Sequence, residues 1–251
     1  MERLNFKKSL GQHFLRSERA LNKIVEIGEI KSSETILEIG PGEGALTEKL
    51  IETGAKVIAV EKDDELFRLL KQKFGDRITL IHGDILNFQT SELPTYKLIA
   101  NIPYNITGLI LKKFLSAENK PQKIVLLVQK EVADRIVAKD KKESVLSISV
   151  KAYGQPHSIE KVLAGSFVPA PKVDSVIISI DNISVDFDEK AFFKVLRAGF
   201  QSKRKKLSSN LANIFDKSAV EKTFLELNLD ENVRAEDVGV ETWKKLAICL
   251  I

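Results

Sequence analysis

The sequence predicts an α/β fold, in which a doubly wound and mostly parallel sheet carries helices on both faces, followed by a small all-helical domain. Three observations predict this fold. Apolar runs of strand length alternate with amphipathic runs of helix length between residues 35 and 139. A glycine-rich turn follows the first of these apolar runs and opens a helix. From residue 186 onward the apolar residues follow a helical period only.

The individual elements follow from this periodicity and from helix caps. A first helix is expected over 17–31, with Ser17 as its cap. The expected strands are 35–39, 56–61, 77–82, 97–101, 123–129, 157–163 and 173–180. The other expected helices are 44–53 (closed by Gly54), 63–74 (closed by Gly75), 107–116, 129–139, 143–153, 188–200, 203–214, 218–226 and 241–250, the last capped by Thr242 or a neighbour. No helix separates the last two strands, so they are predicted to pair as an antiparallel edge.

Composition and length indicate a globular protein with two domains, 1–183 and 184–251. The chain of 251 residues is 43% hydrophobic and 29% charged, and it contains no apolar run near the roughly 20 residues that a membrane helix needs. The N-terminus lacks the apolar core of a secretory signal, and the single cysteine, Cys249, excludes an internal disulfide. We therefore expect a cytoplasmic protein without a membrane partner, and nothing in the sequence indicates more than a monomer.

The net charge of +4 is unevenly distributed. Residues 1–23 carry six basic and two acidic side chains, whereas residues 190–215 carry seven basic side chains and no acidic one. Two positive segments on an otherwise acidic body favour a polyanionic partner such as a nucleic acid. The alternative interpretation is two solvated helical faces, which is the usual explanation of a single charge run.

The glycine-rich turn over residues 36–46 predicts a nucleotide site. Gly40 and Gly42 can adopt positive φ and let a ligand approach the backbone, and the helix that follows points its N–H groups into the turn. Glu61 ends the next apolar run, where an acid would hold ribose hydroxyls. An NAD enzyme and a methyltransferase that uses S-adenosylmethionine both fit these features, and a tight turn without a ligand fits them less well.

The residues at the ends of the later strands help to distinguish an NAD enzyme from a methyltransferase. Ligands of open α/β sheets bind at the carboxyl ends of the strands. Asp84 stands at such an end and could accept a hydrogen bond from an adenine amino group, although a helix cap or Asx turn would also explain it. Asn101 and Pro103 follow the next strand, where the proline stiffens a turn that aims an amide and neighbouring carbonyls at one point.

Such a turn suits a base amine as methyl acceptor. The exocyclic amine is a poor nucleophile because its lone pair is delocalised, and two hydrogen-bond acceptors would favour a more tetrahedral nitrogen. Tyr104 beside them would stack on the base. An ordinary Asn-Pro turn is the alternative interpretation of Asn101 and Pro103, but an NAD enzyme has no evident use for this arrangement. No spacing of His, Cys and Asp predicts a metal site, and no Ser/His/Asp set predicts hydrolysis.

Five motifs in the same order give the chain a resemblance to the ribosomal RNA adenine dimethyltransferases, which are Rossmann-like class I methyltransferases. The resemblance extends from about Lys7 to Asn210, and it is closer to the small-subunit (16S) rRNA branch. The motifs are Leu10-Gly11-Gln12-His13-Phe14-Leu15, Glu38-Ile39-Gly40-Pro41-Gly42, Asn101-Ile102-Pro103-Tyr104-Asn105-Ile106, Gln129-Lys130-Glu131-Val132 and Phe167-Val168-Pro169-Ala170-Pro171-Lys172-Val173-Asp174-Ser175.

The resemblance implies dimethylation of N6 of two adjacent adenosines near the 3′ end of small-subunit rRNA, with S-adenosylmethionine as methyl donor and no metal. The partner it implies is the small ribosomal subunit or its precursor, together with a role in subunit maturation. It assigns the donor site to His13, where many relatives have Asn, and to Leu15, Gly40, Gly42, Glu61, Asp84, Ile85 and Asn101. It assigns catalysis to Asn101, Pro103, Tyr104 and Phe167, with the two aromatic rings stacking on a flipped base. Lys203, Arg204, Lys205 and Lys206 resemble its basic RNA-binding stretch.

Two alternatives stay open at this point. A large-subunit rRNA dimethyltransferase of the macrolide-resistance type would share the donor site and the Asn-Ile-Pro-Tyr turn, but the Pro-Lys-Val-Asp-Ser run and the Lys-Arg-Lys-Lys stretch favour the small-subunit branch. A non-catalytic ribosome-assembly factor could keep the fold, but the intact donor motifs argue against a loss of catalysis.

Overall fold

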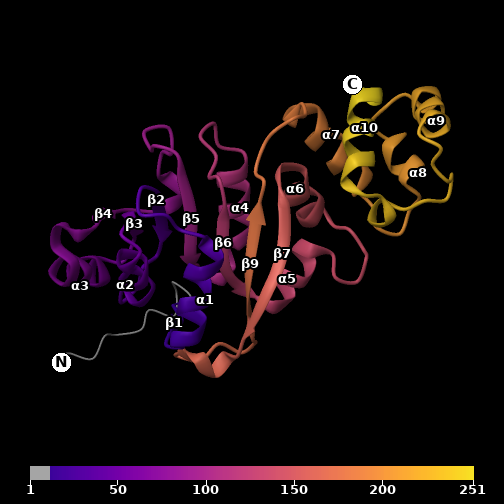
Figure 1. The fold of residues 1–251 in the computed structure, drawn as a ribbon. Helices are drawn as coiled ribbons and strands as arrows, with labels where there is room; N and C mark the ends of the chain where they lie inside the picture. Colours follow the sequence, from indigo (N-terminus) through magenta and orange to yellow (C-terminus); the bar gives the residue numbers. More distant parts are fainter. Residues whose placement is uncertain (1–11) are drawn as a thin grey trace. The chain divides into compact units, whose positions relative to one another are not determined.

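The computed structural model of the chain describes residues 12–251 and divides them into two compact units (Figure 1). Unit 1 contains the described residues up to Ala133 together with Gln155–Ile183, and unit 2 contains Asp134–Gly154 together with Ser184–Ile251. Leu10, Gly11 and the first half of the basic N-terminal segment lie outside the described residues.

The elements of unit 1 alternate as the sequence predicts. Its strands are β1 (Phe14–Leu15), β2 (Thr35–Ile39), β3 (Lys56–Glu61), β4 (Thr79–His82), β5 (Tyr96–Asn101), β6 (Ile124–Gln129), β7 (Gln155–Val162), β8 (Phe167–Val168) and β9 (Ser175–Asp181). Its helices are α1 (Glu18–Gly28), α2 (Ala45–Glu52), α3 (Asp64–Phe74) and α4 (Thr107–Leu115), and α5 (Lys130–Val137) leads from unit 1 into unit 2. Short 3₁₀ turns follow β4 (Ile85–Asn87) and β5 (Tyr104–Ile106).

Seven strands form one sheet in the order β4-β3-β2-β5-β6-β9-β7. The pairs from β4 to β6 are parallel, and β9 is antiparallel to both of its neighbours. This confirms the predicted fold class, with the antiparallel strand one place in from the edge. The strand order reverses between β2 and β5, which makes the ends of these strands the expected ligand crevice.

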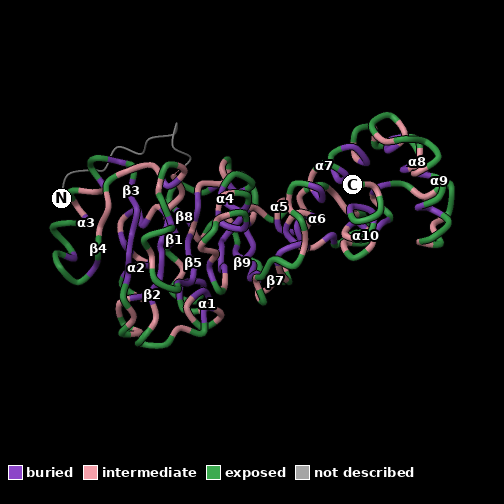
Figure 2. Tube along the Cα trace, turned by 90° about the horizontal axis from the view of Figure 1, so that it is seen from above, coloured by how far each residue is buried: buried purple, intermediate pink, exposed green. Residues whose placement is uncertain are grey.

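Both faces of this sheet are covered, which is why its central strands are almost wholly apolar. One core cluster joins strand side chains such as Ile99 to Ile24 of α1, Leu50 of α2 and Leu70 of α3. The alternate strand residues face the other side, where α4 contributes the fully buried Phe114. Figure 2 shows α1 and α4 on opposite sides of the buried strands. No helix among the described residues is long and apolar enough to cross a membrane.

A two-stranded ribbon outside the main sheet was not predicted. β1 pairs antiparallel with β8, with Phe14 opposite Val168 and Leu15 opposite Phe167. The backbone N–H of Arg16 also donates to the carbonyl of Ser166 at 2.8 Å. The ribbon therefore ties the start of the described chain to the link between β7 and β9.

Unit 2 is helical, with α6 (Val145–Tyr153), α7 (Glu189–Gly199), α8 (Leu207–Leu211), α9 (Lys217–Glu226) and α10 (Val240–Leu250). Its core surrounds the fully buried Trp243. The predicted domain ranges placed residues 134–154 in the first domain, whereas the structure assigns them to the helical unit. The reason is that Ile148 and Ala152 of α6 are buried in the same core as α7 and α10.

Two helix predictions in unit 2 need correction. The helix expected over 203–214 begins only at Leu207, because Lys203–Lys206 contains no apolar residue to pack and forms an exposed turn. The cap of the last helix is Gly239, not Thr242, and it makes no side-chain capping bond.

Candidate active site

The glycine turn connects β2 to α2 with the backbone conformation that its sequence requires. Gly40 has φ +60° and Gly42 has φ +62°, in the left-handed region that side chains other than glycine rarely adopt. A Cβ on Gly42 would lie 2.8 Å from the ring of Phe14, whereas a Cβ on Gly40 would meet nothing within 4 Å. The backbone at Gly40 is therefore open to a ligand, while Gly42 is required by close packing.

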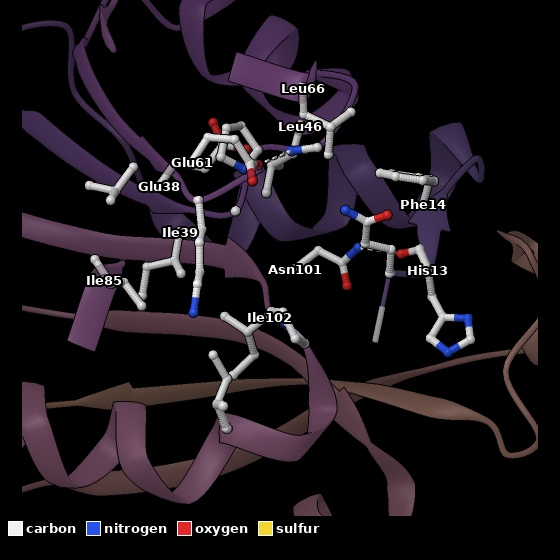
Figure 3. Close-up of a pocket in the computed structure, with 18 of the residues that line it drawn as sticks. His13, Phe14, Glu38, Ile39, Leu46, Glu61, Leu66, Ile85, Asn101 and Ile102 are labelled. Carbon is white, nitrogen blue, oxygen red and sulfur yellow. Dashed lines mark hydrogen bonds between the residues drawn. The ribbon is translucent and has the colours of Figure 1, made fainter. Parts of the chain in front are cut away.

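A cavity of about 280 Å³ lies beside this turn, at the carboxyl ends of β2, β3, β4 and β5. Figure 3 shows apolar side chains around it, among them Ile39, Leu46 and Ile102, with the amide of Asn101 between them and the ribbon strand β1. The predicted site residues that line it are His13, Leu15, Gly40, Gly42, Glu61, Asp84, Ile85, Asn101, Pro103 and Tyr104.

Two buried carboxyl groups give this cavity its electrostatic character. Glu38 is 1% exposed, and burial raises the pKa of its carboxyl to about 8 although Thr47 donates a hydrogen bond to it at 2.7 Å. Glu61 accepts hydrogen bonds from the backbone of Gly42 at 3.2 Å and of Asp63 at 2.8 Å, yet burial still raises its pKa. A positively charged ligand would offset this cost of burying two acids.

Asp84 lies at the same end of the sheet with both of its oxygens engaged. One oxygen accepts from the backbone N–H of Leu86 at 2.9 Å, which makes Asp84 the cap of the 3₁₀ turn, as the alternative interpretation of the sequence has it. The other oxygen pairs with the ammonium of Lys62 at 2.8 Å, which lowers the pKa of Asp84. Asp84 nevertheless lines the cavity, so capping and ligand binding are compatible.

Asn101 is held in one orientation by β1. Its amide nitrogen donates to the backbone carbonyl of His13 at 3.1 Å, which places the amide oxygen on the opposite side of the group (Figure 3). The imidazole Nδ1 of His13 lies 2.7 Å from the carbonyl of Pro169, and a carbonyl only accepts, so this nitrogen carries the proton. The β1 segment thus orients the amide through its backbone and anchors its own side chain elsewhere.

Tyr104 is fixed by two contacts. Its hydroxyl lies 2.6 Å from Oγ of Ser175, the first residue of β9. Its ring stacks on that of His13, with centroids 5.7 Å apart and planes 18° apart. Burial raises the pKa of the Tyr104 phenol, so it keeps its proton at neutral pH.

The structure does not bring Phe167 to this cavity. Phe167 is only 2% exposed and belongs to the core cluster of unit 1, opposite Leu15 in the β1–β8 ribbon. Side chains alternate along a strand, so the inward position of Phe167 leaves Val168, at 44% exposure, as its outward neighbour. The predicted pairing of Phe167 with Tyr104 around a base is therefore not present here, and His13 occupies the place beside Tyr104.

The predicted RNA-binding residues Lys203, Arg204, Lys205 and Lys206 lie in unit 2, in the exposed turn between α7 and α8. Asn210 orders this turn, because its buried amide donates to the carbonyls of Gly199 at 2.7 Å and of Ser202 at 3.0 Å. In the described chain, none of the four basic side chains forms an ion pair.

Two residues of the site, Lys62 and Ser175, were not predicted from the sequence. Lys62 follows the predicted ribose-binding acid directly, so its position beside the cavity was readable from that neighbour. Ser175 belongs to one of the five motifs, but no local pattern indicates that a strand residue reaches Tyr104 across 71 positions of sequence. Within the described residues, no group of three or more His, Cys, Asp or Glu side chains is arranged to hold a metal ion.

The doubly wound sheet carries a glycine turn at its switch point, and its cavity joins strand-end acids to the Asn101–Tyr104 turn, for which an NAD enzyme has no evident use. This combination defines the protein as a Rossmann-like methyltransferase that uses S-adenosylmethionine. The family model for "Ribosomal RNA adenine dimethylase" matches residues 3–251. The chain therefore belongs to the ribosomal RNA adenine dimethylase family, and the resemblance found from the motifs is confirmed.

Individual relatives agree with this family. A "Ribosomal RNA small subunit methyltransferase A" of Dehalococcoides mccartyi strain CBDB1 is 42% identical over 98% of this chain and 88% of its own length. A protein of the same name from Clostridium botulinum strain ATCC 19397 is 36% identical over 98% of this chain and 94% of its own. The crystal structure of a dimethyladenosine transferase from Plasmodium falciparum superposes with a TM-score of 0.83 at 28% identity, covering 93% of this chain and 96% of that one.

Proposed function

We propose that this protein transfers methyl groups from S-adenosylmethionine to N6 of two adjacent adenosines near the 3′ end of small-subunit rRNA, during maturation of the subunit. The proposal rests on one observation: the glycine turn, the oriented amide of Asn101 and the ring of Tyr104 line the same cavity. A donor site alone would not need the last two groups. The matched relatives that bear the small-subunit name support this choice of RNA.

The large-subunit alternative has weaker support. The crystal structure of the 23S rRNA methyltransferase ErmE superposes with a TM-score of 0.79, but its identity with this chain is 24%, which supports the shared fold alone. We also propose, from the same family, that the protein acts as a monomer in the cytoplasm on the small subunit or its precursor.

The residues of the cavity fit S-adenosylmethionine. The open backbone at Gly40 admits a nucleotide. A ligand that carries a sulfonium and an ammonium would favour the ionised forms of the buried carboxyls of Glu38 and Glu61, and would thereby lower the pKa values that burial raises. We assign Glu61 to the ribose, Asp84 and Ile85 to the adenine, and His13, Leu15, Gly42 and Asn101 to the rest of the donor. When bound, S-adenosylmethionine supplies an electrophilic methyl group on sulfur.

The chain's own residues would prepare the acceptor. The amide oxygen of Asn101 and a carbonyl of the turn that Pro103 stiffens accept the two N–H protons of the adenine amine, which directs its lone pair at the methyl carbon. Tyr104 stacks on the base. A bond from N6 to carbon forms as the carbon–sulfur bond breaks, and the acidic proton of the methylated amine passes to water. No strong base is needed.

The first experiment offers radiolabelled S-adenosylmethionine with undermethylated small subunits and, separately, with unmodified large-subunit rRNA. Digestion and separation of the nucleosides should give labelled dimethyladenosine from the small subunit only. Label in the large-subunit RNA would instead identify the protein as a large-subunit rRNA dimethyltransferase of the macrolide-resistance type. Donor binding without label in either RNA would favour an assembly factor or a different acceptor.

Replacement of Asn101 by Ala tests the acceptor chemistry. We expect methyl transfer to fall by about 10² to 10³-fold, as when one preorganised hydrogen-bonding group is removed from an active site. The matched control is Asn105→Ala, which removes a second amide from the same cavity wall. Circular dichroism checks that both variants fold, and near-normal turnover in Asn101→Ala would contradict the assigned role.

The basic turn is tested by replacing Arg204, Lys205 and Lys206 together with Gln. Because each lost phosphate contact removes about 0.7 to 0.9 from the slope of log affinity against log salt, the slope should fall by about two to three. Donor affinity should not change. The control replaces the exposed Lys217 and Lys222 of α9 with Gln. An unchanged slope in the triple variant would mean that the turn is merely solvated.

A further inference from the structure

The hydrogen bond between Tyr104 and Ser175 has no place in the chemistry proposed above. Tyr104 Oη and Ser175 Oγ are 2.6 Å apart, and Ser175 is fully buried. We propose that Ser175 is a positioning residue, which holds the Tyr104 ring in the orientation that stacks on the target adenine. This inference rests on the proposed function, because it concerns the ring that the base would meet.

Ser175 is a rigid point of attachment. It begins β9, where it pairs with Gln129 of β6 on one side and with Val162 of β7 on the other. The residue before it, Asp174, accepts hydrogen bonds from the backbone of Ala164 at 2.9 Å and pairs with Lys161 at 2.8 Å. The Ser175 hydroxyl is therefore fixed by an interior strand and by the polar contacts at its start.

Tyr104 needs such an attachment because its own backbone is not part of the sheet. It opens the 3₁₀ turn after β5, and its neighbours on that turn are partly or fully exposed. The ring of His13 is stacked on the Tyr104 ring but does not contact it through a hydrogen bond to the phenol, whose partner is Ser175. Without the bond to Ser175, the Tyr104 ring could rotate about its side-chain torsions. Binding of the base would then have to restrict this rotation, which costs binding free energy.

This role predicts which kinetic constant changes. The ring would contact the base equally in the bound substrate and in the transition state, and loss of such uniform binding raises KM with little change in kcat. Loss of one neutral hydrogen bond corresponds to about a five- to tenfold increase in KM for the small subunit.

The experiment compares Ser175→Ala, Tyr104→Phe and the double variant. Both single variants remove the same bond, so we expect each to raise KM for the small subunit by about five- to tenfold and the double variant to add less than twofold. The matched control is Ser179→Ala, which removes another buried serine hydroxyl from β9, one bonded to Asp181 at 2.8 Å. Its KM should stay within twofold of the wild type.

A second measurement needs no RNA. The chain has three tyrosines, so ring-labelled tyrosine gives a simple NMR spectrum in which Tyr104→Phe assigns one signal. In Ser175→Ala this signal should shift and narrow as the ring gains freedom, whereas Ser179→Ala should leave it in place. An unchanged Tyr104 signal overturns the inference, whichever RNA the enzyme methylates.

Failure of the function and failure of the inference are thus distinguishable. A wild-type enzyme that does not label small subunits contradicts the proposed function, and the NMR result then decides the position of Tyr104 alone. With an active wild type, a Ser175→Ala KM equal to that of Ser179→Ala, or additive effects in the double variant, overturns the inference. A loss confined to kcat would do so as well.

Discussion

Replacement of Glu38 by Gln should stabilise the protein, and the gain should grow as the pH rises. The folded state raises the pKa of Glu38 from 4.5 to about 8 because the carboxyl is buried. Below pH 4.5 the folded and unfolded chains both hold the proton. Between pH 4.5 and 8 the unfolded chain has lost it while the folded chain keeps it, so the free energy of unfolding falls as the pH rises.

The size of the effect follows from this interval. Each pH unit lowers the free energy of unfolding by about 1.4 kcal/mol, which sums to about 5 kcal/mol above pH 8. Gln carries no charge and keeps an oxygen that can accept the hydrogen bond from Thr47. The difference between variant and wild type should therefore increase by about 3 kcal/mol between pH 5.5 and pH 8.5.

Urea unfolding followed by circular dichroism measures this difference at the two pH values. Glu52→Gln, which removes an exposed carboxyl from α2, controls for the loss of one surface charge. Burial also raises the pKa of Glu61, but Glu61 is present in every protein compared, so its effect cancels in the difference. A Glu38→Gln difference that is equal at pH 5.5 and pH 8.5 would refute the reasoning, because it would mean that Glu38 is ionised in the folded chain.

Two further predictions concern glycines. Gly40→Ala and Gly42→Ala should both weaken donor binding in calorimetry, beyond the strain of positive φ that both suffer, about 1–2 kcal/mol. A Cβ on Gly40 would stand on the side of the backbone that is open to the donor, and a Cβ on Gly42 would displace the ring of Phe14. Unchanged donor affinity in Gly40→Ala would contradict this. Gly199→Ala would place a Cβ 2.3 Å from Trp243, so it should destabilise unit 2 by about 1–3 kcal/mol in unfolding followed by Trp243 fluorescence. Lys190→Ala, at an exposed position of the same helix α7, is the control and should leave the transition nearly unchanged.

Features that depend on nearby residues were predictable from the sequence. The strands 35–39 and 56–61 have the predicted bounds, because buried parallel strands are continuous apolar runs. Ser17 caps α1 through a side-chain hydrogen bond, and Gly75 ends α3 with positive φ, since both depend only on bonds within a few residues. The gathering of strand-end residues into one cavity also follows, because parallel strands end at one edge of the sheet.

Features that depend on distant partners were not predictable. The strands of the β1–β8 ribbon are two residues long, too short to show a period, and they exist only because each pairs with the other. The ribbon also buries Phe167, which the motif alone predicted to stack on the flipped base. Likewise, α6 precedes two strands of the sheet in sequence, but its apolar side chains are buried with those of α7 and α10.

The ribbon has a consequence for the order in which the protein matures on the ribosome that synthesises it. The contact of His13 with Pro169 joins residues 156 positions apart, and closing so long a loop is slow compared with forming local structure. The glycine turn and the strands around it emerge early, whereas the segment that anchors β1 emerges after two thirds of the chain. The amide of Asn101 acquires its fixed orientation only when that segment has folded back, so a nascent chain can hold its first strands before it can present a finished acceptor site.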